Sequence, residues 1–231
     1  MSLAEQIARA KADYDEVYEA GKQTAYDGFW DVYQDNGNRT DFQFAFGGKG
    51  WNDSTFKPKH SIQITAAREM FNGCKITNLK SILDMQNVTF DFSKCTDFTL
   101  FLSNSDITHF GVLDCTAIKN VGYLLYEAKK LVYLEKLIIA ADGSQTFTDQ
   151  TFGGAIALKD IIVEGVFGSS VKMLQQPLSR ASLESVIAAL STTATGQTLT
   201  VRKSAVEAAF TTEEWETLVA TRSNWTITLY G

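Results

Sequence analysis

The amino-acid sequence predicts an α+β repeat solenoid that follows an N-terminal coiled-coil or helical stalk and ends in a C-terminal αβαβ cap. Three observations support this prediction: helical periodicity at the start of the chain, a repeated apolar pattern in its middle, and alternating helix and strand patterns at its end. The predicted organisation is a stalk over 1–34, an aromatic-rich N-terminal cap over 35–65, four repeats over 66–177 and the C-terminal cap over 178–231.

The stalk is predicted from apolar residues at alternating spacings of four and three, which is typical of the seam of a coiled coil. We expect chains to self-associate along this seam, with a homotrimer as the predicted assembly. A single amphipathic helix that packs on its own domain is the alternative, and the sequence does not decide between the two. The predicted oligomerisation residues are Leu3, Ile7, Ala10, Tyr14 and Val17.

Residues 29–56 contain eight aromatic residues. Phe42, Phe44 and Phe46 alternate with other residues, which predicts a strand with one buried face. These rings are expected to cover the open end of the following core, because a stack of repeats needs a cap at each end. A platform on which sugars or bases stack is the alternative interpretation.

The middle of the chain repeats an aromatic residue or leucine followed by apolar residues six and nine positions later. Successive repeats begin 30, 24 and 27 residues apart, which suits a solenoid with one short strand and one helical or turn-like segment per coil. The large side chains are predicted to share one core. They are Phe101, Ile107 and Phe110; Leu125, Leu131 and Leu134; Phe152, Leu158 and Ile161; and, after deletion of one residue, Phe71, Ile76 and Leu79.

Alternate residues of the predicted strands should point outward and form rows across neighbouring coils. One such row contains Asn78, His109, Tyr133 and Asp160, and these four residues are the candidate binding face. An ordinary solvated sheet face is the alternative interpretation. A second predicted row contains Lys80, Gly111, Glu135 and Ile162.

The spacing within the strands predicts bulges in alternate strands. The next apolar residue follows three positions after Leu79 and after Leu134. The next core position is predicted only two residues after Phe110 and after Ile161, at Val112 and Val163.

The last part of the chain is expected to form an αβαβ unit whose two strands extend the sheet of the repeats. Thr211 or Thr212 is expected to cap the helix that contains Trp215. The predicted elements are a helix over 182–190, a strand over 198–201, one or two helices over 204–220 and a strand over 225–229.

The composition and motifs favour a protein without catalytic or nucleic-acid-binding activity. A net charge of −6 opposes nonspecific binding to nucleic acids and anionic membranes, which requires a basic surface. The two histidines, His60 and His109, belong to no metalloprotease, deaminase or serine-hydrolase motif. Cys74, Cys95 and Cys115 are expected to be buried free thiols. We therefore predict no enzymatic activity, no cofactor, no metal and no nucleic-acid partner.

No stretch of the sequence reaches the ~20 apolar residues of a membrane span. Residues 1–21 lack the apolar segment of a signal peptide. We therefore expect a chain that starts in a cytoplasm and does not insert into a membrane.

The segment Phe152-Gly-Gly-Ala-Ile-Ala-Leu158-Lys-Asp-Ile161 resembles the BspA-like (Treponema-type) leucine-rich repeats, and the resemblance covers about residues 66–176. It implies a leucine-rich-repeat-like solenoid without an asparagine ladder. The spacing in this chain is less regular than in that family, and no proline follows the strand.

Other segments resemble virion proteins of phages that infect Gram-positive bacteria, where such proteins are fibre, tail-appendage or other minor structural components. This resemblance implies a non-enzymatic virion protein that is assembled in the cytoplasm of the host bacterium. Its stalk would serve anchoring and assembly with other virion proteins, and its repeats would bind a host-surface glycan or protein. The segments are 17–22, 29–34, 37–40, 55–59 and 223–228.

Two other functions stay open. A bacterial BspA-like adhesion or interaction protein would share the repeats. A hydrolase that acts on host glycans would need two carboxylates facing each other in a cleft, and Asp160 with Glu135 or Glu164 is the candidate pair.

Overall fold

The computed structural model describes residues 40–48 and 50–231. The predicted stalk over 1–34 lies outside the described residues. The same holds for all of its predicted oligomerisation residues, Leu3, Ile7, Ala10, Tyr14 and Val17.

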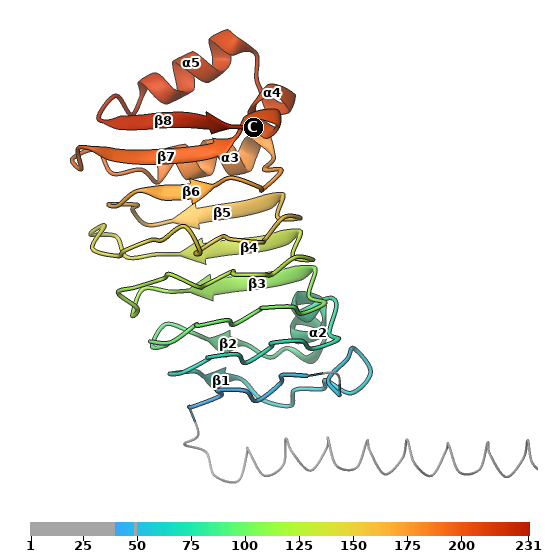
Figure 1. Cartoon of the computed structure of the whole chain (residues 1–231). Coiled ribbons are helices and arrows are strands. Elements are labelled where there is room, and N and C mark those ends of the chain that lie inside the picture. Colours follow the sequence, from blue (N-terminus) through green and yellow to red (C-terminus); the bar gives the residue numbers. More distant parts are fainter. Residues whose placement is uncertain (1–39, 49) are drawn as a thin grey trace, which may run out of the picture.

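The described part of the chain is a mixed α/β domain with four helices and three small parallel sheets (Figure 1). The strands are β1 (Ile62–Gln63), β2 (Phe90–Asp91), β3 (His109–Asp114), β4 (Tyr133–Ile138), β5 (Asp160–Glu164), β6 (Val171–Met173), β7 (Gln197–Arg202) and β8 (Trp225–Tyr230). The helices are α2 (Leu79–Gln86), α3 (Arg180–Ala188), α4 (Lys203–Ala209) and α5 (Thr212–Ala220).

The strands lie one above another in chain order, from β1 at one end to β8 at the other (Figure 1). They form the sheets β1-β2, β3-β4-β5 and β6-β7-β8, and every strand pair is parallel. Because neighbouring strands are parallel, the chain must cross back after each strand to the end where the next strand begins. The connections therefore build the opposite side of the domain.

The prediction of an α+β repeat solenoid, closed by a C-terminal αβαβ cap that extends its sheet, is wrong for the described part of the chain. The strands belong to three separate sheets, and the connections from β3 to β4 and from β4 to β5 contain turns and no helix. These connections are rich in turn-forming residues, and Gly143 and Gly154 have φ values of +66° and +78°, which glycine adopts at no steric cost. A repeating helix is therefore replaced by turns.

The C-terminal strands also fail to extend the sheet of β3, β4 and β5, because α3 covers the edge of β5. The backbone N–H of Ile161 donates to Ser182 Oγ at 2.8 Å, and that of Val163 donates to Ser185 Oγ at 2.8 Å. Two serine hydroxyls thus occupy the positions where the carbonyls of another strand would accept. As a result β7 and β8 pair with β6 in a separate sheet.

The core contains the large apolar residues that the repeated pattern singled out. Each of the twelve is at most 2% exposed, and all belong to one cluster of buried residues. The prediction that these positions share a dry interior is confirmed, although the sheets around that interior differ from those expected. The repeated pattern therefore reports burial rather than the type of element.

The strand predicted around Phe42, Phe44 and Phe46 is absent. Residues 43–46 form a turn in which Phe44 has a φ of +59° and is 58% exposed, while Phe42 and Phe46 are buried. The turn points the middle ring away from the core. The alternating burial of these three rings therefore results from a tight turn and not from a strand.

The bulge prediction is correct for one strand pair and wrong for another. The register between β4 and β5 shifts between Leu134 and Leu137, as the spacing indicated. In β3, by contrast, Val112 is 44% exposed and Leu113 is buried, so β3 matches β4 without a shift. The hydrophobicity of Val112 alone had suggested an inward position.

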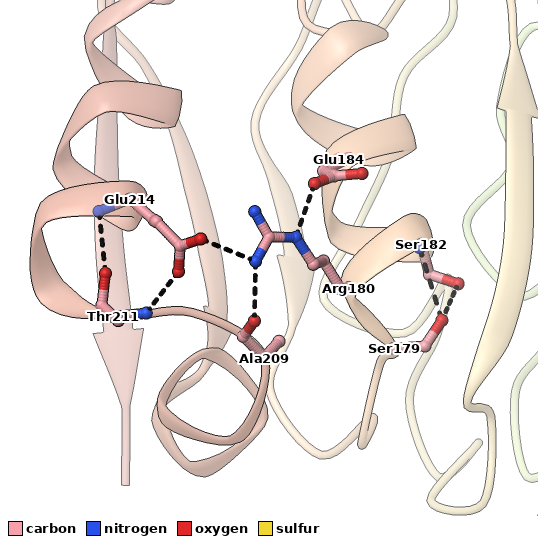
Figure 2. Close-up of polar contacts among 7 residues, drawn as sticks. All are labelled: Ser179, Arg180, Ser182, Glu184, Ala209, Thr211 and Glu214. Atoms are coloured by element: carbon pink, nitrogen blue, oxygen red, sulfur yellow. Dashed lines mark hydrogen bonds and ion pairs between the residues drawn. The ribbon is translucent and has the colours of Figure 1, made fainter.

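The C-terminal elements lie within two residues of their predicted bounds. Thr211 and Glu214 form a capping box at the start of α5, in which each side chain accepts a hydrogen bond from the other residue's backbone N–H. Arg180 at the start of α3 donates to Glu184, to Glu214 and to the carbonyl of Ala209, and so joins α3 to the α4–α5 segment (Figure 2). Within residues 40–48 and 50–231, no helix is long and apolar enough to cross a bilayer.

Candidate binding surface

The structure brings Asn78, His109, Tyr133 and Asp160 into one row. Asn78 and His109 form an isolated parallel bridge, His109 is in register with Tyr133, and Tyr133 is in register with Asp160. All four residues are half-buried. The row crosses the amino-terminal ends of β3, β4 and β5, where backbone pairing fixes the spacing between neighbouring side chains at the ~5 Å that separates strands.

Contacts with neighbours orient several side chains of this row. The rings of His109 and Tyr133 have centroids 5.8 Å apart at an interplanar angle of 37°. His109 Nδ1 lies 2.9 Å from Thr108 Oγ1. Asn78 accepts a hydrogen bond from the backbone N–H of Ser81 and caps α2. The row thus combines two aromatic rings with a carboxylate, while the amide of Asn78 has a structural role.

The second predicted row also lies across neighbouring elements. Lys80 Nζ is 2.6 Å from a carboxylate oxygen of Asp84 and 3.4 Å from one of Glu135. The hydrogen bond with Asp84, and then that with Glu135, raises the pKa of Lys80 above its ordinary value. Gly111 lies between, and a Cβ there would stand 3.8 Å from Lys80 Cγ. Lys80 therefore reaches across β3 over a residue without a side chain.

Two apolar residues add to the same face. Val112 on β3 and Ile162 on β5 are each 44% exposed. Between them, Lys136 on β4 forms an ion pair of 2.8 Å with Glu164 on β5. The outer face of this sheet therefore mixes exposed aliphatic surface with paired charges.

Two of the three carboxylates proposed for a hydrolase, those of Glu135 and Glu164, form ion pairs with lysines. Glu135 pairs with Lys80, and Glu164 pairs with Lys136, whose pKa is raised by that hydrogen bond. Four hollows on the described surface are lined by residues other than Asp160, Glu135 and Glu164. Two lysines therefore hold the glutamates on the sheet face.

The three cysteines are free and buried, as the sequence predicted. Burial raises the pKa of Cys74 and of Cys95 to about 12, and it raises that of Cys115 well above its usual range. A thiol with so high a pKa is a poor nucleophile at neutral pH. Within the described ranges, no three or more His, Cys, Asp or Glu side chains are grouped to hold a metal ion.

Sequence reasoning missed two features outside the sheet face. The first is the Arg180 cluster, where the guanidinium contacts Glu184 and Glu214 (Figure 2). The same guanidinium lies 4.5 Å from the centre of the Phe210 ring and lines a hollow of about 440 Å³. The second is a pair of tyrosines, Tyr123 and Tyr126, in the connection from β3 to β4.

Comparison of the chain with protein-family models, with curated proteins and with solved structures finds no match in any of the three.

Proposed function

We propose that this chain is a non-enzymatic structural protein of a phage virion, a fibre or tail appendage, whose described domain binds a host-surface glycan or protein through the outer face of β3, β4 and β5. The observation that carries the binding part is the row in which His109, Tyr133 and Asp160 stand in register on paired strands. The virion part rests on the resemblance of the segments named above. Self-association through residues 1–34 completes the proposal.

Rigid strands support a binding role because they hold side chains in place before a partner arrives. Preorganised groups lose less conformational entropy on binding than groups on mobile loops. The row offers two aromatic rings and a carboxylate, and Val112 and Ile162 supply exposed apolar area beside it. Aromatic residues with a polar rim are typical of binding hot spots.

Cell binding tests the proposed face. The full chain, labelled with a fluorophore, is mixed with intact cells of the Gram-positive bacterium whose genome or phage carries the gene. We expect the double variant His109→Ala/Tyr133→Ala to bind about tenfold more weakly or worse, because two central rings are removed. Tyr230→Ala is the control, since Tyr230 is 54% exposed on a different sheet. Wild-type binding by the double variant would contradict the proposed face.

Two further measurements test the virion part. Light scattering of the full chain should give a mass several times that of one chain, and three times is the predicted value. Mass spectrometry of purified phage particles should detect the protein. A monomer in solution, or a protein made during infection that is absent from the particles, would rule out the fibre or appendage role.

A further inference from the structure

Two tyrosines in the connection from β3 to β4 each line a hollow. The rings of Tyr123 and Tyr126 have centroids 5.5 Å apart and meet edge to face at 80°. Tyr123 is 48% exposed and lines a hollow of about 260 Å³. Tyr126 is half-buried and lines a hollow of about 390 Å³. The larger hollow is within the range of small-molecule sites, and the smaller one lies just below it.

The smaller hollow carries hydrogen-bonding groups beside the ring of Tyr123. Its lining includes Asp97, Asn120 and Thr148. The Asn120 side-chain oxygen accepts from the N–H of Gly122 at 2.9 Å, which orients the amide. Thr148 Oγ1 donates to the carbonyl of Gly122 at 2.9 Å. The amide nitrogen of Asn120 makes no hydrogen bond within the described residues, so it is available as a donor.

The larger hollow carries charges that are already paired. Lys172 Nζ lies 2.7 Å from Asp149 Oδ2, and Glu127, which also lines the hollow, forms an ion pair with Lys129 outside the lining. Gln150 and the exposed Gln175 add uncharged amides to its lining. Lys172 is thus engaged, and no other lysine or arginine is among the described residues that line this hollow, so it offers no unpaired cation to a phosphate or sulfate.

Two glycines keep the floor of the larger hollow open. A Cβ at Gly154 would lie 2.6 Å from Glu127 Oε1, and one at Gly153 would lie 2.9 Å from Gln150 Oε1. Both distances are shorter than real contacts of this kind. The absence of side chains therefore leaves Glu127 and Gln150 in place around the hollow.

We infer that an uncharged oligosaccharide binds across Tyr123 and Tyr126 and fills the two hollows. A sugar ring has an apolar C–H face, which packs on aromatic rings, and a rim of hydroxyl groups, which pair with amides and carboxylates. Both kinds of group line the two hollows, whereas no unpaired lysine or arginine is among their described lining residues. This site uses no residue of the face of β3, β4 and β5, so it stands or falls separately from the proposed function.

The test uses three soluble probes: maltotriose, cellotriose and triacetylchitotriose. Saturation-transfer NMR on the full chain, at millimolar probe concentration, should show that at least one of them binds. Tyr123→Ala and Tyr126→Ala should each weaken that binding about tenfold or more, because each removes one ring. Tyr126→Phe should retain binding, since the ring is kept.

Two controls separate this site from the sheet face and from an anion site. His109→Ala/Tyr133→Ala should bind the probe like the wild type, and inorganic phosphate should not compete. Melting temperatures identify any variant that fails to fold, and Tyr123→Ala is the safer variant because its ring is the more exposed. The inference is overturned if none of the three probes binds, if both tyrosine-to-alanine variants bind normally, if the double variant loses the probe, or if phosphate displaces it.

Discussion

The two ends of the described chain build their cores from different side chains. Over residues 40–114 the core is dominated by phenyl rings, and Phe46 alone has five ring neighbours with centroids 5.0–6.2 Å away. From residue 178 onward, α3, α4 and α5 bring mostly aliphatic residues, with Phe210, Trp215 and Trp225 at the margin. The two parts also differ in their backbone φ angles.

Non-glycine residues with a left-handed backbone lie mostly in the aromatic part. Among the described residues, the non-glycine residues with positive φ all come before residue 128. They are Phe44, Glu69, Asn87, Leu100, Asn104 and Glu127, with φ values of +52° to +59°. Such conformations are uncommon for residues with a side chain and cost free energy. The comparison teaches that large rings fill the space between tight turns, whereas helices with ordinary caps suffice where aliphatic residues form the core.

Truncation of Phe46 gives the largest expected effect. Phe46→Ala should lower the free energy of unfolding by ~3–5 kcal/mol, because a fully buried ring with five ring neighbours leaves a cavity. Ile187→Ala on α3 should cost ~2–5 kcal/mol and serves as the matched change in the other core. Urea denaturation measures both. A loss below ~1 kcal/mol for Phe46→Ala would break the comparison.

Removal of one serine hydroxyl should have the next largest effect. Ser182→Ala leaves the buried N–H of Ile161 without its acceptor, which should cost ~1–3 kcal/mol. Part of this loss reflects the contact with the Ser179 cap. Ser170→Ala is the control, because its hydroxyl makes hydrogen bonds in an exposed position. Equal losses for the two variants would show that covering the edge of β5 contributes nothing.

Acid should weaken both parts through paired carboxylates, by a smaller amount. The hydrogen bond from Lys130, and then that from Lys75, lowers the pKa of Asp106. The backbone N–H of Thr211, and then Arg180, lowers the pKa of Glu214. A lowered pKa in the folded state stabilises the fold above the carboxyl's ordinary pKa of about 4, and that contribution disappears as the pH falls through the folded-state pKa.

The variant Asp106→Asn makes this prediction measurable. At pH 7 its melting temperature should lie below that of the wild type, and the gap should narrow at pH 3 and close at still lower pH. The melting temperatures of the wild type and the variant are measured by thermal unfolding at pH 7, at pH 3 and at a lower pH. A gap that widens towards low pH would have the wrong sign for a carboxylate held by Lys130 and Lys75.

The smallest expected effect belongs to the sheet face. Tyr133→Ala should change the free energy of unfolding by about 0.5 kcal/mol or less, because the ring is half-buried on the outer face. Leu134→Ala, one residue further along β4, is the matched control and should cost ~2–5 kcal/mol. Similar losses for both variants would show that Tyr133 is a core residue, and that would remove it from the candidate binding face.

The sequence carried information on burial and on local capping better than on the kinds of elements. The twelve repeated apolar positions are buried, because large apolar side chains leave water whatever element carries them. The capping box of Thr211 and Glu214 is present, because it depends on two residues close in sequence. The exposure of Phe44 was not predictable from alternation, since it follows from a left-handed backbone that the turn imposes.

The end of the sheet at β5 required knowledge of the tertiary structure. Nothing in the spacing around Ser182 or Ser185 indicates that their hydroxyls accept from strand N–H groups some twenty residues earlier. The candidate row behaves differently: Asn78, His109, Tyr133 and Asp160 could be aligned from the repeat alone, because parallel register preserves the offset between repeats. Tyr123 and Tyr126 lie outside the repeated apolar positions, so their contact with each other could not be anticipated.

The serine-lined seam between α3 and β5 also sets a limit on how this chain can be lengthened. A duplicated strand unit placed after β5 would have to displace α3 and release the hydroxyls of Ser182 and Ser185. A unit inserted between β4 and β5 would separate one parallel strand pair and form two parallel pairs in its place. Longer natural or engineered versions of this domain should therefore grow by internal insertion, with α3 kept as the terminator.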